Sequence, residues 1–276
     1  MALTVNTNMA AQVAANTLNQ TQGSLSNTLA RVSSGLRITK AADDAAGQAV
    51  AQNLSTRSRS GRQAIRNSND GISVIQTAEA ATKEVLSIMD RMRELAVQSS
   101  SETLEDGERA YVDAEFDQLR NEVDRIASST EFNDIALADG TNTALVVQVG
   151  VDNASSSRIS ISLGDVSVSG VGMTGSAIDL SKASSAKSAI DTIDTAMDSV
   201  NKIRSDYGAV QNRLDSSIRN MSTYVESLTA AASQIMDADY AHETAEMTRL
   251  QVMQQAGVAA LSQAKGINQS VISLLG

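Results

Sequence analysis

The stretch that decides the fold runs from Met247 to Leu274 and reads MTRLQVMQQAGVAALSQAKGINQSVISL. Its apolar and small residues recur at steps of three and four, the spacing of a helix that packs in a coiled coil. They are Met247, Leu250, Met253, Gly257, Ala260, Ala264, Ile267, Val271 and Leu274. Because Gly257, Ala260 and Ala264 are small, the pattern predicts a helix that another backbone can approach closely.

The N-terminal end has a similar pattern and a similar composition. Its apolar residues at heptad-like spacing are Leu18, Leu25, Leu29, Val32 and Leu36. Residues 1–30 contain no Asp, Glu, Lys or Arg, and Lys265 is the only charged residue after Arg249. Since solvated helix surfaces normally carry charge, both ends are expected to be covered by other helices; disordered tails are the alternative.

Composition excludes several kinds of site. The 276 residues include no Cys, no Pro, no Trp and one His. Disulfides, cysteine nucleophiles and multi-histidine metal sites are therefore excluded. A net charge of −10 disfavours nucleic acid and anionic membranes as partners. Only 2% of the residues are aromatic, which favours long, closely packed helices over a compact globule.

The middle of the chain predicts three further helices. The longest spans residues 44–99 and would be about 80 Å long, a length that is typical of rods and bundles. A shorter helix covers residues 112–126, and a third covers residues 186–230. We therefore expect a mainly α protein: an elongated, rod-like helical bundle, with terminal helices that form a coiled-coil-like core layer.

Residues 140–175 depart from the helical pattern. Apolar residues alternate with other residues from Leu145 to Val151 and again from Ile159 to Leu163, and residues 152–155 separate the two runs. A period of two predicts a small β-hairpin. Val166 and Val168 continue the alternation and predict a third strand.

The dinucleotide-binding pattern G-x-G-x-x-G occurs at residues 170–175. The dinucleotide-binding fold requires a second parallel strand after the helix that follows this pattern, whereas the sequence continues into a long amphipathic stretch. We interpret the segment as a flexible, Gly-rich connection.

A candidate metal site surrounds His242. On a helix, Asp239, His242 and Glu246 share one face, and an imidazole with two carboxylates can hold a cation. The zinc-protease pattern H-E-x-x-H is incomplete, because Glu246 replaces its second His. We interpret the three residues as a solvated patch, and we expect no metal, no cofactor and no catalytic residue.

Charges gather in two patches. The basic patch comprises Arg57, Arg59, Arg62 and Arg66, and the acidic patch comprises Glu102, Glu105, Asp106, Glu108, Asp113, Glu115 and Asp117. Such patches are either solvated faces or a means to steer like subunits into register, and both interpretations stay open. Asp43 and Asp44 precede an Ala-rich run and are interpreted as a helix N-cap with first-turn acid.

Several motifs resemble those of bacterial flagellins, in the same order along the chain. They are SSGLRI at residues 33–38, DDAAGQA at 43–49, MRELAVQS at 92–99, EFN at 131–133 and VISLL at 271–275. Two features depart from the family pattern: Gly276 ends the chain where a basic residue is common, and a Pro that is frequent near the C-terminus is absent.

The resemblance implies a structural subunit that polymerises into the flagellar filament for swimming motility. Residues 1–43 and 233–276 would be filament-core helices, packed through the two apolar seams above, and residues 44–232 would be a rod domain with the hairpin. Little sequence separates the two conserved halves, so the chain is similar to a minimal flagellin without large outer domains. A hook–filament junction protein of the same superfamily is the alternative, and an enzyme or metal-binding module is disfavoured.

The resemblance also implies partners and a location. The chain would form a helical homopolymer outside the cell, after export in unfolded form through the flagellar type III apparatus. No secretory signal peptide is apparent, which agrees with that route. An export chaperone would hold the C-terminal segment, and filament cap and hook-junction proteins would contact the assembled chain.

A host receptor is a further implied partner. By resemblance, Arg91, Leu95 and Glu115 occupy the positions that the animal flagellin-sensing Toll-like receptor engages. Arg91 and Leu95 are i, i+4 neighbours, so we expect a cation beside an apolar surface group. The alternative is that Leu95 belongs to the core. Leu119 stands where many detected flagellins carry a basic residue.

Overall fold

The computed structural model describes residues 7–174 and 178–275, with side chains up to residue 266. The chain divides into two compact units. Unit 1 comprises the chain up to Arg57 and from Ser227 onward, and unit 2 comprises Ser58–Glu226.

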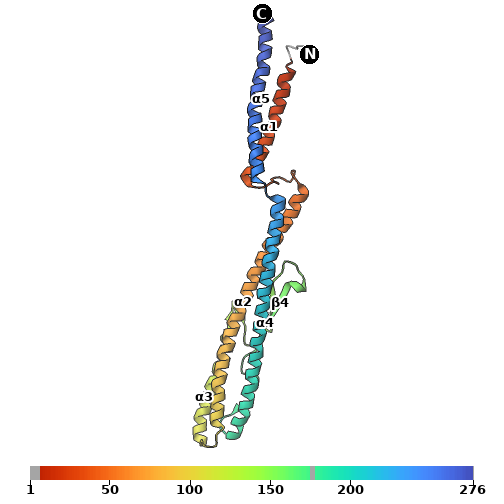
Figure 1. Cartoon of the computed structure of the whole chain (residues 1–276). Helices are drawn as coiled ribbons and strands as arrows, with labels where there is room; N and C mark the ends of the chain where they lie inside the picture. The colour runs from red at the N-terminus through yellow and green to blue at the C-terminus, as the bar shows by residue number, and fades with distance from the viewer. Residues whose placement is uncertain (1–6, 175–177, 276) are drawn as a thin grey trace. The chain divides into compact units, whose positions relative to one another are not determined.

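Unit 1 contains the two terminal helices. α1 (Met9–Ser34) and α5 (Tyr240–Leu275) pack side by side in antiparallel orientation (Figure 1). α1 begins after Asn8, whose side chain accepts a hydrogen bond from the Ala11 amide at 3.0 Å. It ends at Gly35, which has a left-handed φ of 71° that a residue without Cβ adopts at little cost. Among the described residues, no helix is long and apolar enough to cross a membrane.

Unit 2 is a bundle of long helices. α2 (Ala45–Ser99) runs antiparallel to α3 (Asp106–Ser129) and to α4 (Ala183–Met236) (Figure 1). An ion pair of 2.6 Å joins Arg93 Nε on α2 to Asp194 Oδ1 on α4. These helices confirm the three that the periodicity predicts, and α3 and α4 each begin before and end after the predicted residue ranges.

The core of unit 2 has two parts. The larger lies among α2, α3 and α4, and its fully covered side chains include Met89, Met92 and Phe116. The smaller lies around the β-hairpin and includes Ile161 and Tyr207. Valine, isoleucine, leucine and alanine make up most of the buried core, and Phe116 and Tyr207 are its aromatic members among the described residues, so the helices pack closely along their length.

The predicted hairpin is present and shorter than its sequence pattern. β3 (Ala144–Gln148) pairs antiparallel with β4 (Arg158–Ser162) and places Val147 opposite Ile159. The turn includes a short 3-10 helix, η1 (Ser155–Ser157). The hairpin lies against α2, where Asn67 Nδ2 donates a hydrogen bond to the Gln148 carbonyl at 3.2 Å.

A second hairpin was not apparent from the sequence. β1 (Glu131–Phe132) pairs with β2 (Ile135–Ala136), and the intervening Asn133 and Asp134 have φ of 50° and 62°. Strands of two residues are too short to show alternation, so the left-handed pair Asn-Asp is the one signal that could have located this turn.

The third strand predicted at Val166 and Val168 is wrong. Both side chains are buried, but the backbone is irregular: the Val166 amide donates to the Ala138 carbonyl, and the Val168 amide donates to Asp124 Oδ1. Alternate side chains enter the core here as they would from a strand, which explains why the sequence alternates. No strand partner lies beside this segment among the described residues.

The interpretation of the Gly-rich segment as a flexible connection is also wrong for its described part. Val171, Met173, Ile178 and Leu180 are buried in the larger core. The Leu180 amide also donates to Asp113 Oδ1 on α3 at 2.9 Å. Gly175 lies outside the described residues. The described part of the segment is therefore held by the burial of Val171 and Met173, and Leu180 beyond it is held by a hydrogen bond to α3.

The turn from α2 to α3 is built around a buried arginine. Arg109 is 4% exposed, and its guanidinium donates hydrogen bonds to the carbonyls of Ser99, Ser101 and Leu104. Helix α2 leaves its last carbonyls without intrahelical partners, and Arg109 satisfies the one at Ser99. The guanidinium thereby fixes the end of α2 relative to the first turn of α3.

Candidate functional site

The interface between α1 and α5 is partly polar on the α1 side. The covered positions on α1 include a run at steps of three and four: Leu18, Thr21, Leu25, Thr28 and Val32. The two threonines are buried, whereas the predicted Leu29 is 55% exposed. A search for apolar residues misses Thr21 and Thr28, although their spacing relative to Leu18 and Leu25 is that of a seam.

The covered positions on α5 differ in part from the predicted seam. They include Glu243, Met247, Leu250, Gln254, Gly257, Leu261 and Ala264. Met253 and Ala260 are exposed, and Gln254 and Leu261 take the corresponding places. The predicted seam thus combines two neighbouring faces of one helix. Its last three members, Ile267, Val271 and Leu274, lie outside the described side chains.

Polar contacts and one small residue align the two helices. Asn8 Nδ2 donates to the Ala264 carbonyl at 2.9 Å, and Gln254 donates to Gln22. A Cβ at Gly257 would lie 3.3 Å from Leu18 Cδ1, so this glycine allows α1 to come close. The contacts fix the register of the pair while burying few large apolar side chains.

The terminal pair leaves apolar side chains uncovered. Most of the large exposed apolar residues in the described part of the chain lie on these two helices: Met9, Val13, Leu29, Tyr240, Val252, Met253 and Val258. Their exposed fractions range from 42% to 64%. Because α1 and the far half of α5 carry almost no charge, this surface is suited to contact with protein.

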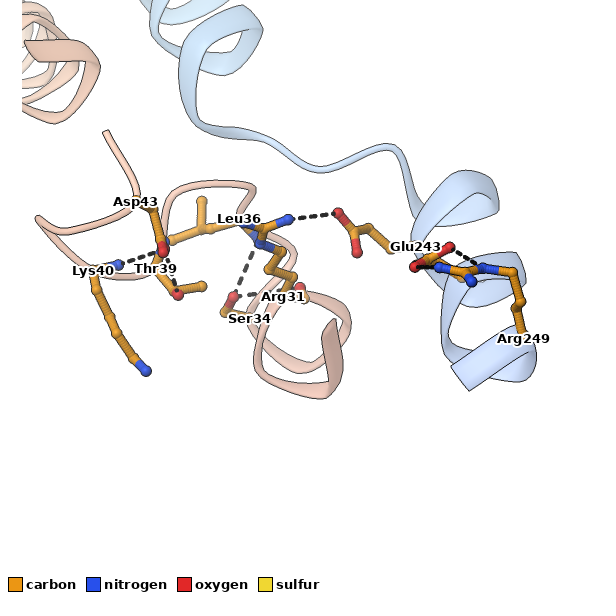
Figure 2. A network of polar contacts seen from close by, with 9 residues as sticks. Arg31, Ser34, Leu36, Thr39, Lys40, Asp43, Glu243 and Arg249 are labelled. Carbon is orange, nitrogen blue, oxygen red and sulfur yellow. Dashed lines mark hydrogen bonds and ion pairs between the residues drawn. The ribbon is translucent and has the colours of Figure 1, made fainter. Parts of the chain in front are cut away.

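The chain leaves α1 through a turn that also receives the end of α4. The predicted seam residue Leu36 is not on α1: it lies after Gly35 and forms an isolated antiparallel bridge with Asp237. The Arg37 amide donates to the Met236 carbonyl at 2.6 Å. Figure 2 shows Arg31 in this region with its guanidinium directed at Glu243 of α5, at 3.4 Å. Glu243 is 7% exposed, so the carboxylate of this ion pair is largely withdrawn from water, whereas the Arg31 side chain is 33% exposed.

Asp43 and Asp44 have the helix-start roles expected of them. Asp44 Oδ1 accepts a hydrogen bond from the Gly47 amide at 2.8 Å, as an N-cap of α2 does. Asp43 Oδ2 accepts from the amides of Thr39 and Lys40 and from the Thr39 hydroxyl (Figure 2). The pKa of the Asp43 carboxyl is lowered by these hydrogen bonds, first by the one from the Thr39 amide and then by those from the Lys40 amide and the Thr39 hydroxyl.

The structure brings Arg91 and Glu115 together at the surface. Arg91 Nη2 lies 2.9 Å from Glu115 Oε1, and Arg91 Nη1 lies 2.9 Å from Glu94 Oε2. The hydrogen bonds that Arg91 donates to Glu115, and then the one to Glu94, raise the pKa of Arg91. Leu95 is 1% exposed, so the expectation that it presents an apolar surface group is wrong. It packs in the core beneath the ion pair, which is the alternative that the sequence left open.

The acidic patch divides into three kinds of residue. Asp113 holds the Leu180 amide, and Glu115 and Asp117 pair with Arg91 and Arg120. The acids near the α2–α3 turn remain exposed: Glu102, Glu105, Asp106 and Glu108. In the basic patch Arg59, Arg62 and Arg66 are exposed on α2, and Arg66 donates to Gln63 Oε1.

The three residues around His242 have separate roles in the structure. Asp239 Oδ1 accepts from the amides of Ala241 and His242 at the start of α5. Glu246 pairs with Arg249, and that hydrogen bond lowers the pKa of the glutamate. Within residues 7–174 and 178–275, no cluster of three or more His, Asp or Glu side chains could hold a metal ion.

Long helices, a core fixed by helix packing and an uncovered apolar face on paired termini define a class of protein: a helical subunit of a larger assembly. The family models agree with this class. The bacterial flagellin N-terminal helical region matches residues 5–143, and the bacterial flagellin C-terminal helical region matches residues 190–275.

Known relatives extend the match along the chain. A flagellin of Halalkalibacterium halodurans is 45% identical over 89% of both chains. The flagellar filament 33 kDa core protein of Treponema phagedenis is 37% identical over 98% of this chain and 99% of its own. The crystal structure of Bacillus cereus flagellin has a TM-score of 0.50, 30% identity, and coverage of 56% of this chain and 88% of that one.

The chain belongs to the bacterial flagellin family. It is a structural subunit of the extracellular flagellar filament and has the minimal form, without large outer domains. The predicted fold class, mainly helical with a small β-hairpin, is confirmed.

Proposed function

We propose that the α1–α5 pair is the filament-core layer of this flagellin, and that residues 1–43 and 233–276 are the two segments of the chain that form it. Residues 44–232 would then form the rod domain. The observation that carries the proposal is the uncovered apolar face of α1 and α5, because α1 and the far half of α5 are almost free of charge. Neighbouring copies would cover this face, because a single pair buries too little surface to hide it.

The proposal gives the seam residues two roles. Leu18, Leu25, Gly257 and Ala264 would hold α1 against α5 within one subunit, where they are partly covered. Leu29 and Ala260 would contact neighbouring subunits, since both are exposed in the single chain. Ile267, Val271 and Leu274 remain candidates for the same core by their spacing.

A charge at Ala260 tests this division. Ala260→Glu should leave the helical content of the monomer unchanged, because the side chain is exposed there. In the filament the carboxylate would be buried without a partner, at a cost of several kcal/mol per subunit. We expect no filaments by negative-stain microscopy, whereas the matched Ala80→Glu, at an exposed position of α2, should polymerise. Normal filaments from Ala260→Glu would contradict the assignment.

Export and assembly partners follow from the same proposal. The subunit would pass unfolded through the flagellar type III apparatus, which needs no cleaved signal peptide, with a chaperone on the C-terminal segment. Cap and hook-junction proteins would contact the assembled chain. The few buried side chains on α1 and α5 support this, because a pair that is weakly stable alone opens readily for export.

A receptor contact is proposed at Arg91 and Glu115. Both side chains are about half exposed and joined by a hydrogen-bonded ion pair, so they present a fixed polar feature on α2 and α3. The Toll-like receptor that senses flagellin would engage this pair, with Leu95 supporting it from the core.

A further inference from the structure

One groove of unit 2 is unusually rich in unneutralised cationic and hydroxyl groups. It has a volume of about 580 Å³ and lies between the hairpin turn and α4. Its polar lining comprises Arg158, Arg213, Ser155, Ser156, Ser216 and Asn220. We refer to it as the arginine groove.

Neither arginine of the groove has a carboxylate partner among the described residues. Arg158 donates to Gln148 Oε1 at 3.2 Å and to Asn153 Oδ1, which are both neutral amide oxygens. Arg213 is exposed, and no ion pair or hydrogen bond between described residues includes it. In a chain with a net charge of −10, two such guanidinium groups in one groove form a site that suits carboxylates.

The matching carboxylates lie at the α2–α3 turn. This acidic turn comprises Glu102, Glu105, Asp106 and Glu108. The side chains of Glu102 and Asp106 are 84% and 95% exposed. Their cationic neighbours are Lys187 and Arg109, at 3.8 Å and 3.7 Å, which leaves the turn with a net negative charge.

The two features cannot meet within one chain. The hairpin reaches α2 at Asn67, and the acidic turn follows Ser99 at the far end of the same helix. At about 1.5 Å per residue, that stretch of α2 is about 48 Å long. A contact between a surface and a different surface of another copy repeats without closing, and it generates an open, head-to-tail polymer.

We propose that the arginine groove of one subunit receives the acidic turn of the next subunit, as a longitudinal contact of the polymer. The inference rests on the filament assembly stated above and adds to it a named pair of surfaces. Its contribution is to the alignment of subunits and to the rate of addition, because exposed charge pairs contribute more to steering than to affinity.

Charge exchange tests the contact. Arg158→Glu with Arg213→Glu, and separately Glu102→Lys with Asp106→Lys, should each raise the critical concentration for polymerisation at low salt by about tenfold. The chain that carries all four changes should return to within about twofold of the wild type, because each surface meets its complement again. Lys83→Glu with Lys202→Glu is the matched control for the arginine reversal, since both lysines are exposed and the change in net charge is the same as in that variant.

The outcomes separate this contact from the filament function. The contact alone would be overturned if the charge reversals raised the critical concentration no more than the control does. It would also be overturned if the variant with all four changes stayed impaired in polymerisation although circular dichroism shows that its monomer is folded. A wild-type chain that forms no filaments would contradict the assembly itself.

Cysteine cross-linking gives a second readout, because the natural chain has no cysteine. Thr103→Cys with Ser216→Cys places one thiol at the acidic turn and one in the groove. Oxidised filaments of this variant should give a ladder of covalent multimers on a non-reducing gel, since a disulfide requires Cα atoms within about 7 Å. Thr103→Cys with Ser73→Cys, an exposed site between the two ends of α2, should give none. Absence of a ladder from the first variant would overturn the proposal.

Discussion

At the scale of single residues, the polar groups near the ends of helices have specific structural roles. Asp44 caps α2, Asp239 caps α5, and Arg109 holds the turn between α2 and α3. Each satisfies backbone groups that a helix leaves unpaired at its ends. In a chain without Pro, such side-chain caps provide the signals that stop and start the helices.

Asp43 makes the turn after α1 sensitive to acid. Its pKa is lowered in the folded chain, so the ionised carboxylate stabilises the turn above the unfolded pKa of about 4, and this contribution is lost as the pH falls through the folded pKa. Nuclear magnetic resonance of the side-chain carbon should give a pKa below about 4. The amide chemical shifts of Thr39 and Lys40 should change with pH along the same titration curve, and this pH dependence should disappear in the variant Asp43→Asn. Amide shifts that titrate equally in that variant would refute the assignment.

The surface pair Arg91 and Glu115 predicts how a receptor reads the monomer. Arg91→Ala with Glu115→Ala should remove most of the signal from cells that report on the flagellin receptor, without unfolding the bundle, because both side chains are exposed. Leu95→Ala is unsuitable, since a cavity in the core would cost about 2–5 kcal/mol.

The matched control for this prediction is an exposed ion pair within α3. Arg125→Ala with Glu122→Ala removes an ion pair of similar exposure and should leave the signal unchanged. A silent wild-type monomer, or an unchanged signal from the Arg91 and Glu115 variant, would refute the receptor contact.

At the scale of elements, α2 and α3 depend on the buried guanidinium between them. Arg109→Met would leave the carbonyls of Ser99, Ser101 and Leu104 without their donor. We expect a loss of about 3 kcal/mol in the free energy of unfolding, measured by urea titration. The exposed Arg125→Met should cost less than about 0.5 kcal/mol. Equal midpoints for the two variants would show that Arg109 is an ordinary surface residue.

The helices were predictable from sequence because their periodicity is long and regular. Residues 44–99 and 186–230 maintain the 3-4 pattern over many turns, and α2 and α4 cover these ranges. The irregular segment after β4 was not predictable from sequence. Val166 and Val168 alternate with other residues as in a strand, but their amides donate hydrogen bonds to Ala138 and Asp124. Alternate burial has the same pattern whether or not a partner strand exists.

The terminal seams show the limit of reading a face from sequence. Met253 and Ala260 fit a 3-4 spacing as well as Gln254 and Leu261 do, and only the position of α1 decides which pair is covered. The buried Thr21 and Thr28 contribute to the α1 side because a threonine can bond its hydroxyl to its own helix, as Thr21 does to the Thr17 carbonyl at 2.9 Å. A pattern of apolar residues alone does not contain this information.

At the scale of the whole molecule, membership of the flagellin family explains features that no single chain requires. The subunit carries uncovered apolar residues on α1 and α5 and unneutralised arginines on unit 2. A monomer gains nothing from either. In a polymer, neighbouring subunits would cover the apolar residues, and their carboxylates would pair with the arginines. Both features are therefore those of a protein whose packing is completed by other copies of itself.

We propose that neighbouring subunits cover the terminal helices in the filament. Hydrogen exchange followed by mass spectrometry, on monomer and on filament, tests it most directly. We expect the amides of α1 and α5 to exchange rapidly in the monomer and to become strongly protected in the filament, while the core of unit 2, around Met92 and Phe116, is protected in both. Equal protection of the terminal helices in monomer and filament would contradict the account.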